Sequence, residues 1–270
     1  MTIKFKTVAA LGALLGALAG CGQEEKDPNY IKVGVIVGAE QQVAEVAQKV
    51  AKDKYGLTVE LVTFNDYVLP NEALSKGDID LNAFQHKPYL DQQIKDRGYK
   101  LVAVGNSFVY PIAGYSKKIK SLDELQNGAQ IALPNDPTNL GRSLLLLQKQ
   151  GLIKLKDNVG LLPTVLDVIE NPKNLKLVEL EAPQLPRSLD DDQITLAIIN
   201  TTYASQINLT PTKDGLFVEE KDSPYVNLIV AREDNKDAAN VKKFVQAYQS
   251  DEVYEAANNK IFNGGAVKGW

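Results

Sequence analysis

The stretch Ile31-Lys-Val-Gly-Val-Ile-Val37 predicts a buried β-strand, because it is a short run of mostly β-branched residues that stops at a glycine. The next segment, residues 43–55, has apolar side chains at Val43, Val46 and Val50, a spacing that indicates an amphipathic helix. A strand followed directly by such a helix is the opening of a βαβ unit, in which parallel strands lie beneath helices. This stretch therefore predicts an α/β fold.

The alternation of strand and helix patterns continues to the C-terminus and divides the chain into two α/β units. Further strands are expected at residues 59–64, 79–84, 101–104, 109–115, 130–133, 175–179, 196–200 and 226–230. Further helices are expected at residues 71–76, 88–96, 121–124, 138–150, 164–170, 201–207, 237–249 and 251–258. The helix at 121–124 is expected to begin with a capping box, Ser121-Leu-Asp-Glu124.

Each unit is expected to form a lobe with a mainly parallel sheet flanked by helices. We assign residues 30–112 and 226–270 to lobe 1 and residues 113–225 to lobe 2. Two crossover strands would then join the lobes as a hinge. A ligand is expected in the cleft between them.

Composition excludes several classes of site. The 270 residues carry a formal charge of -4, which argues against a nucleic-acid binder, since such proteins rely on basic patches. One cysteine and one histidine cannot build a Cys/His zinc site, and one cysteine cannot form an internal disulfide. Residues 78–89 begin like a calcium loop but lack its glycine and its final glutamate, and the usual nucleotide-binding loops do not occur. We expect no metal, no cofactor and no nucleic-acid partner.

The N-terminal segment has the pattern of a secretory signal. Lys4 and Lys6 precede an apolar run at residues 8–19, which is too short to span a membrane. The run ends in Leu18-Ala19-Gly20-Cys21, which resembles the lipobox of bacterial lipoproteins, whose cysteine is acylated; the alternative is an ordinary cleavage site with a free cysteine. The predicted parts are a signal peptide, residues 1–20; a lipidated anchor, Cys21; and a tether, residues 21–29.

One candidate site lies in Pro134-Asn-Asp-Pro-Thr-Asn-Leu-Gly-Arg142, where a strand ends and a helix begins. The backbone N–H groups of residues 138–141 would point outward at a helix N-terminus, which favours an anion. Arg142, on the first turn, could add a bidentate pair to a carboxylate. The alternative is a capped helix with a surface arginine.

A second cluster combines aromatic rings with amides at strand ends. The rings come from Tyr67, Phe84, His86 and Tyr89, with Gln85 among them, and they suit an apolar or thioether side chain unless they are simply core. Asn200 and Asn227 supply amides whose oxygens could accept a hydrogen bond from an ammonium group, and Tyr203 lies shortly after Asn200. Together with Arg142, the clusters describe a site for a zwitterionic amino acid.

Several long motifs in order also resemble one known family. They are Val33-Gly-Val-Ile-Val-Gly-Ala-Glu40, Phe64-Asn-Asp-Tyr-Val-Leu-Pro-Asn71, Asn82-Ala-Phe-Gln-His-Lys-Pro-Tyr89, Pro134 to Arg142 and Phe262-Asn-Gly-Gly-Ala-Val-Lys-Gly-Trp270. The chain resembles the methionine-binding lipoproteins of bacterial ABC importers, within the NlpA lipoprotein family. The match covers essentially the whole chain.

The resemblance implies a two-lobed periplasmic-binding-protein fold, type 2-like, that closes on L-methionine and possibly D-methionine. It also implies a lipid-anchored protein on the cell membrane, facing the periplasm, that delivers to an ABC permease and its ATPase subunits. The thioether would lie among Tyr67, Phe84, His86 and Tyr89. The carboxylate would meet Arg142, with Asn139 nearby, and the amino group would meet Asn200 and Asn227, with Tyr203 added. No residue is expected to be catalytic.

Three alternatives stay open at this point. The first is a receptor for a methionyl dipeptide or another apolar amino acid, because an aromatic box accepts leucine nearly as well as methionine. The second is a periplasmic enzyme that uses His86 as a base, and the third is a structural lipoprotein with a vestigial cleft.

Overall fold

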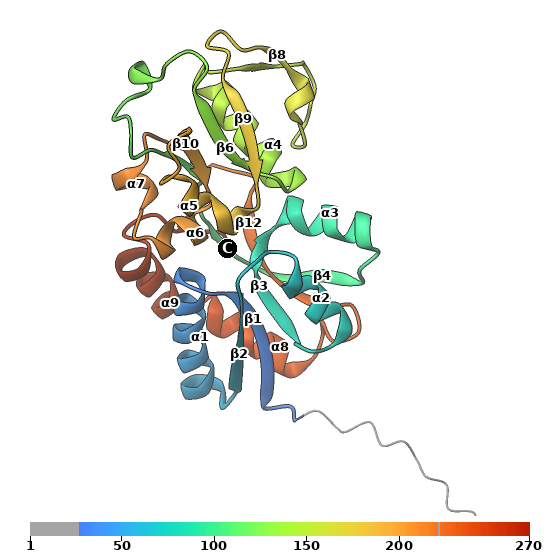
Figure 1. Ribbon diagram of the computed structural model, residues 1–270. Helices are drawn as coiled ribbons and strands as arrows, with labels where there is room; N and C mark the ends of the chain where they lie inside the picture. The colour runs from blue at the N-terminus through green and yellow to red at the C-terminus, as the bar shows by residue number, and fades with distance from the viewer. Residues whose placement is uncertain (1–26, 221) are drawn as a thin grey trace, which may run out of the picture.

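The computed structural model describes residues 27–220 and 222–270 as two lobes, each built on its own β-sheet (Figure 1). The predicted signal peptide, Cys21 and most of the predicted tether lie outside the described residues. Lobe 1, which includes the first and the last strands, occupies the lower half of Figure 1, and lobe 2 the upper half.

The sheet of lobe 1 has six strands in the order β13-β4-β12-β3-β1-β2. They are β1 (Tyr30–Ile36), β2 (Thr58–Phe64), β3 (Leu81–His86), β4 (Leu101–Val109), β12 (Val226–Arg232) and β13 (Val267–Lys268). The helices are α1 (Ala39–Tyr55), α2 (Leu69–Lys76), α3 (Lys87–Arg97), α8 (Ala239–Tyr248) and α9 (Asp251–Glu255), the last continued by a π-helical turn, Ala256–Ile261. Helix α1 packs its buried face, which includes Val43 and Val50, against α8 and the sheet.

The sheet of lobe 2 has five strands in the order β11-β5-β10-β6-β9. They are β5 (Ala113–Tyr115), β6 (Gln130–Pro134), β9 (Lys176–Leu180), β10 (Ile194–Ile199) and β11 (Phe217–Val218), with a separate hairpin of β7 (Lys154–Leu155) and β8 (Val168–Glu170). The helices are α4 (Pro137–Lys149), α5 (Leu185–Ser188), α6 (Thr201–Gln206) and α7 (Pro211–Asp214). Short 3-10 turns lie at Leu122–Glu124, Val165–Asp167 and Ala182–Gln184.

Both sheets are mixed, whereas the sequence predicted mainly parallel ones. In lobe 1, β1 pairs parallel with β2 and β3, but β12 pairs antiparallel with both β3 and β4. In lobe 2, β10 pairs parallel with β6 and antiparallel with β5. In lobe 1 the difference is caused by β12, with which the chain returns from lobe 2: it lies between β3 and β4 and runs antiparallel to both, so it is not part of a βαβ unit.

Three local predictions were wrong. The strand expected at 109–115 is divided between β4 and β5, with Pro111 in the crossover between them. The helix expected at 164–170 is a single 3-10 turn followed by β8, because Val168 and Glu170 pair with β7. Ser121 makes no capping hydrogen bond; a capping box is found instead at Thr164 and Asp167.

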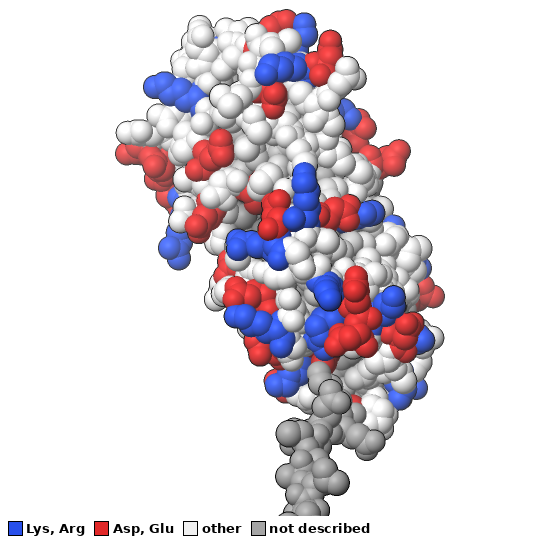
Figure 2. All heavy atoms as spheres, turned by 90° about the vertical axis from the view of Figure 1, so that its right-hand side faces the viewer, with Lys and Arg blue, Asp and Glu red and all other residues white. Residues whose placement is uncertain are grey.

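The surface of the described residues carries charges of both signs. On the face shown in Figure 2, lysine and arginine are interspersed with aspartate and glutamate, and neither sign forms one large patch. Across residues 27–220 and 222–270, no helix combines the length and the apolar character needed to cross a bilayer.

Candidate ligand-binding site

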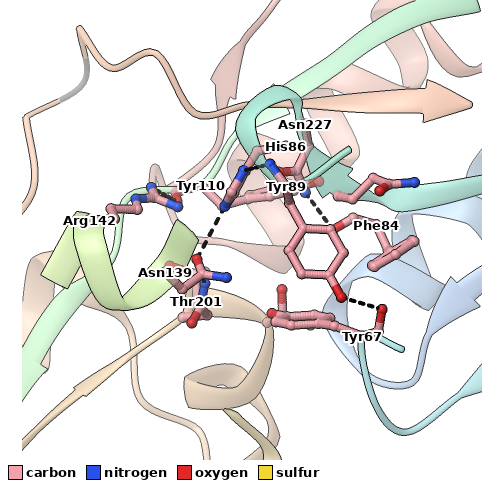
Figure 3. Close-up of a pocket in the computed structure, with 12 residues that line it drawn as sticks. Tyr67, Phe84, His86, Tyr89, Tyr110, Asn139, Arg142, Thr201 and Asn227 are labelled. Carbon is pink, nitrogen blue, oxygen red and sulfur yellow. Dashed lines mark hydrogen bonds between the residues drawn. The ribbon is translucent and has the colours of Figure 1, made fainter. Parts of the chain in front are cut away.

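A pocket lies where the two lobes meet, and residues of both lobes line it. It is lined by Tyr67, Phe84, Gln85, His86, Tyr89, Tyr110, Asn139, Arg142, Asn200, Thr201, Thr202 and Asn227 (Figure 3). Lobe 1 contributes the carboxyl end of β3 and the start of β12, and lobe 2 contributes the first turns of α4 and α6. The lining therefore depends on both lobes being close together.

One end of the pocket is aromatic. The ring of Tyr67 stacks on Phe84 at a centroid distance of 5.8 Å and meets Tyr89 edge-on at 6.2 Å. Phe84 and Tyr89 are 6.0 Å apart, and the Tyr89 hydroxyl donates to the Tyr67 carbonyl at 2.8 Å. These hydrogen-bonded and mutually packed rings form a preorganised apolar wall that can hold a thioether or alkyl side chain.

His86 connects this wall to the polar part of the pocket. Its Nδ1 caps α3 by accepting from the Tyr89 N–H at 3.1 Å, so the ring proton is on Nε2, which donates to Asn139 Oδ1 at 3.2 Å. Burial, together with the positive charge of Arg142, lowers the His86 pKa to about 3. The imidazole is therefore neutral at pH 7, and both nitrogens are engaged, which leaves none free to act as a base.

Arg142 lies at the opposite end from the aromatic wall (Figure 3). Its Nε donates to one carboxylate oxygen of Glu219 at 2.9 Å, and its Nη2 donates to the other oxygen and to the Tyr110 carbonyl. The guanidinium carbon lies 4.3 Å from the centre of the Tyr225 ring. Within the described residues no hydrogen bond uses Nη1. Glu219 thus fixes a buried arginine while one of its nitrogens stays free for a ligand carboxylate.

Three asparagine amides complete the polar part. Asn139 Oδ1 accepts from Asn200 Nδ2 at 2.9 Å, and the Asn200 Oδ1 is buried without a partner among the described residues. Asn227 Nδ2 donates to the Phe84 carbonyl at 3.1 Å and to Glu40 at 3.4 Å, so its Oδ1 is the end left for a ligand. The pocket therefore presents amide oxygens, which suit a cationic donor such as ammonium.

The predicted anion site at the N-terminus of α4 is already occupied by the protein. Asp136 caps the helix: its Oδ1 accepts from the Asn139 N–H at 2.9 Å, and its Oδ2 accepts from Asn139 Nδ2 at 2.9 Å. The Leu140 N–H donates to the Asp136 carbonyl. The expectation that free N–H groups at residues 138–141 would hold the anion was therefore wrong for Asn139 and Leu140.

Eight of the nine predicted ligand residues line the pocket. Tyr203 lies behind it, with its ring 5.0 Å from that of Tyr67 and its hydroxyl donating to the Asn65 carbonyl at 3.2 Å. The sequence did not predict Tyr110, Thr201 and Thr202 in the pocket, nor Glu219 beside it. Thr201 and Thr202 directly follow Asn200 at a strand-to-helix junction, and this position could have predicted them as pocket residues. No sequence pattern indicates that Glu219 pairs with Arg142. Residues 27–220 and 222–270 contain no group of three acidic, histidine or cysteine side chains that could hold a metal.

Comparison with known proteins identifies the family. The model of the NlpA lipoprotein family matches residues 31–270. The chain belongs to the NlpA lipoprotein family. It is 88% identical to the D-methionine-binding lipoprotein MetQ of Escherichia coli K12 over 272 residues, covering 100% of both chains.

Solved structures agree with this assignment. A periplasmic substrate-binding protein of an ABC transporter from Coxiella burnetii is 50% identical, has a TM-score of 0.84, and the match covers 88% of this chain and 99% of the other. A nutrient-binding protein from Burkholderia cenocepacia bound to methionine is 54% identical, has a TM-score of 0.86, and the match covers 89% of this chain and 100% of the other. The predicted two-lobed periplasmic-binding-protein fold is confirmed.

Proposed function

We propose that this protein binds methionine in the pocket between its lobes and delivers it to an ABC importer without chemical change. The observation that carries the proposal is the polarity of the pocket: Arg142 lies at one end, the aromatic wall at the other, and amide oxygens between them. The carboxylate would meet Arg142, the ammonium would meet Asn200 and Asn227, and the thioether would lie against Phe84. The names of its relatives support the same ligand.

The proposal extends to transport and location. A ligand held by both lobes stabilises the closed arrangement, and the permease with its ATPase subunits would recognise that closed shape. Residues 1–20 would be removed as a signal peptide, and acylated Cys21 would hold the protein on the membrane, facing the periplasm, through the tether at residues 21–29.

The identity of the ligand can be tested by native mass spectrometry of freshly purified protein. We expect a bound mass equal to that of methionine, and after unfolding and refolding to remove it, calorimetric binding of L-methionine and D-methionine. A bound methionyl dipeptide or leucine would contradict the substrate assignment. Failure of every amino acid to bind or to raise the melting temperature would favour a structural lipoprotein.

The role of Arg142 can be tested with Arg142→Ala. A hydrogen bond to a charged group contributes about 1.5–3 kcal/mol, so we expect affinity for L-methionine to fall by roughly 10- to 100-fold. The exposed Arg97, changed to alanine, is the matched control and should bind like the wild type. Because the variant also leaves Glu219 unpaired, circular dichroism should first show that it is folded. Unchanged affinity in folded Arg142→Ala would remove Arg142 from the site.

A further inference from the structure

Glu40 is a buried carboxyl group directly behind the pocket. Gly38, with φ of +109°, allows the tight turn from β1 into α1 and places Glu40 in the first turn of that helix. The Glu40 side chain is 1% exposed. Its Oε1 accepts from the Thr202 hydroxyl at 2.8 Å and from Asn227 Nδ2 at 3.4 Å, whereas its Oε2 has no hydrogen-bond partner among the described residues.

Among the residues that the structure describes, no cationic side chain forms an ion pair with this group. The ionisable side chains that face it are phenols, which are neutral at pH 7: Tyr67, Tyr110, Tyr203 and Tyr248. Glu40 forms no salt bridge within residues 27–220 and 222–270. A buried ionised carboxylate without a partner is costly, and this burial raises the Glu40 pKa to about 8.

Both hydrogen-bond partners of Glu40 line the pocket. Asn227 donates its two amide hydrogens backward, to Glu40 and to the Phe84 carbonyl, and so presents its oxygen to the ligand. Thr202 reaches Glu40 from α6 of lobe 2, whereas Glu40 itself belongs to lobe 1. The Glu40 carboxyl group is thus separated from the expected ammonium position by one side chain, that of Asn227. Its hydrogen bond with Thr202 connects the two lobes.

We propose that Glu40 is the buried counter-charge for the ammonium group of the ligand, and that it releases a proton to solvent when the ligand binds. The inference rests on the proposed function, because it takes an amino acid as the ligand. In the closed arrangement without ligand, Glu40 is mainly a protonated acid at neutral pH. The incoming ammonium group, which already carries its protons, favours the carboxylate, so one O–H bond of Glu40 breaks and the proton passes to the buffer.

The carboxylate also strengthens its two hydrogen bonds, because a charged acceptor binds N–H and O–H donors more tightly than a neutral one. One of these bonds orients Asn227, and the other joins the lobes through Thr202. Glu40 is therefore a positioning residue, and its ionisation couples the charge of the ligand to closure of the cleft.

Calorimetry with L-methionine at pH 7 tests the proton release, because a released proton adds the ionisation heat of the buffer to the measured heat. With a Glu40 pKa of about 8 in the closed arrangement without ligand, we expect the wild type to release up to roughly 0.9 proton, seen as different heats in phosphate and in Tris. His86 stays neutral at this pH and contributes none. Glu40→Gln should give equal heats in the two buffers, and the exposed control on the same helix, Glu45→Gln, should behave like the wild type.

The pH dependence of affinity gives a second readout. Wild-type affinity should rise by up to about tenfold per pH unit as the pH increases toward 8, because the carboxylate is the form that favours the ligand, and Glu40→Gln should remove this slope. Thr202→Val, which keeps the carboxyl group, should bind more weakly but still release the proton. Wild-type binding with equal heats in both buffers would overturn the role of Glu40 and leave the proposed function intact. Absence of any methionine binding by the wild type would overturn the proposed function itself.

Discussion

At the scale of single residues, His86 shows how one side chain serves both the fold and the pocket. Its Nδ1 caps α3, its Nε2 reaches Asn139 on the opposite lobe, and its ring forms part of the pocket wall. Burial, together with the positive charge of the neighbouring Arg142, disfavours the protonated imidazole, which is why the His86 pKa is far below its ordinary value. The histidine has no nitrogen left for catalysis, in agreement with a binding function.

The neutral His86 predicts a pH-dependent stability. An unfolded histidine is protonated below a pH of about 6.5, whereas the folded one stays neutral down to about 3, so the unfolded state binds more protons in this window. The contribution of His86 to the unfolding free energy should therefore fall as the pH decreases from 6.5, by at most about 1.4 kcal/mol per unit. Urea unfolding between pH 4.5 and 7 should show a smaller loss for His86→Gln than for the wild type.

The comparison is direct because His86 is the only histidine in the sequence. Other titrating groups, including Glu40, are common to both proteins and cancel in the difference. If the unfolding free energies of wild type and variant changed equally with pH, His86 would have the same pKa in the folded and unfolded states, contrary to the prediction.

At the scale of elements, the start of α4 shows how a helix N-terminus of lobe 2 contributes to the polar side of the pocket. Pro137 begins the helix, Asp136 caps it, and Asn139 and Arg142 follow on its first turns. Asp136 bonds both the backbone and the side chain of Asn139, so the cap also sets the orientation of the amide that bonds Asn200 and His86. Helix stability and ligand geometry therefore depend on the same carboxylate.

Asp136→Ala should affect both properties. Loss of an N-cap costs about 0.5–2 kcal/mol of stability, which lowers the melting temperature by a few degrees in a protein of this size. Methionine affinity should also fall, because Asn139 loses the acceptor that orients it. Ser250→Ala, which removes the cap of α9 away from the pocket, is the matched control and should lose stability only. If Asp136→Ala and Ser250→Ala bound methionine with equal affinity, the Asp136 cap would have no effect on ligand binding.

At the scale of the whole molecule, side chains of the two lobes bond to each other directly around the pocket. His86 meets Asn139, Glu40 meets Thr202, and Tyr203 of lobe 2 donates to the Asn65 carbonyl of lobe 1. These contacts exist only when the lobes are close, so they stabilise the closed arrangement that the ligand also favours.

Tyr203→Phe tests this coupling because it removes one interlobe hydrogen bond and leaves the ring in place. A single hydrogen bond contributes about 0.5–1.5 kcal/mol, so we expect calorimetry to show methionine affinity reduced by roughly 2- to 10-fold. The control is Tyr30→Phe, whose hydroxyl donates to Glu60 within lobe 1. If both variants bind like the wild type, the Tyr203 hydroxyl does not contribute to closure. Small-angle scattering should show the ligand-free variant more open than the ligand-free wild type.

The sequence by itself determined the α/β class, most of the strands and helices, and eight of the pocket-lining residues. The reason is that these features depend on near neighbours in the chain: the apolar period of α1, the glycine and proline that bound elements, and the polar side chains at the carboxyl ends of strands β3 and β10. Prediction failed where a neighbouring strand overruled the local pattern, as in β8, where the pairing with β7 replaced the expected helix.

Only the tertiary structure decided which charged and polar groups meet. Glu219 pairs with Arg142 from 77 residues away, and Thr202 reaches Glu40 from 162 residues away. The direction of β12, which made the sheet mixed, likewise follows from where the chain returns to lobe 1. A buried polar atom forms a hydrogen bond with a group that the tertiary fold places nearby. That group can be far away in the chain, so no local pattern in the sequence predicts it.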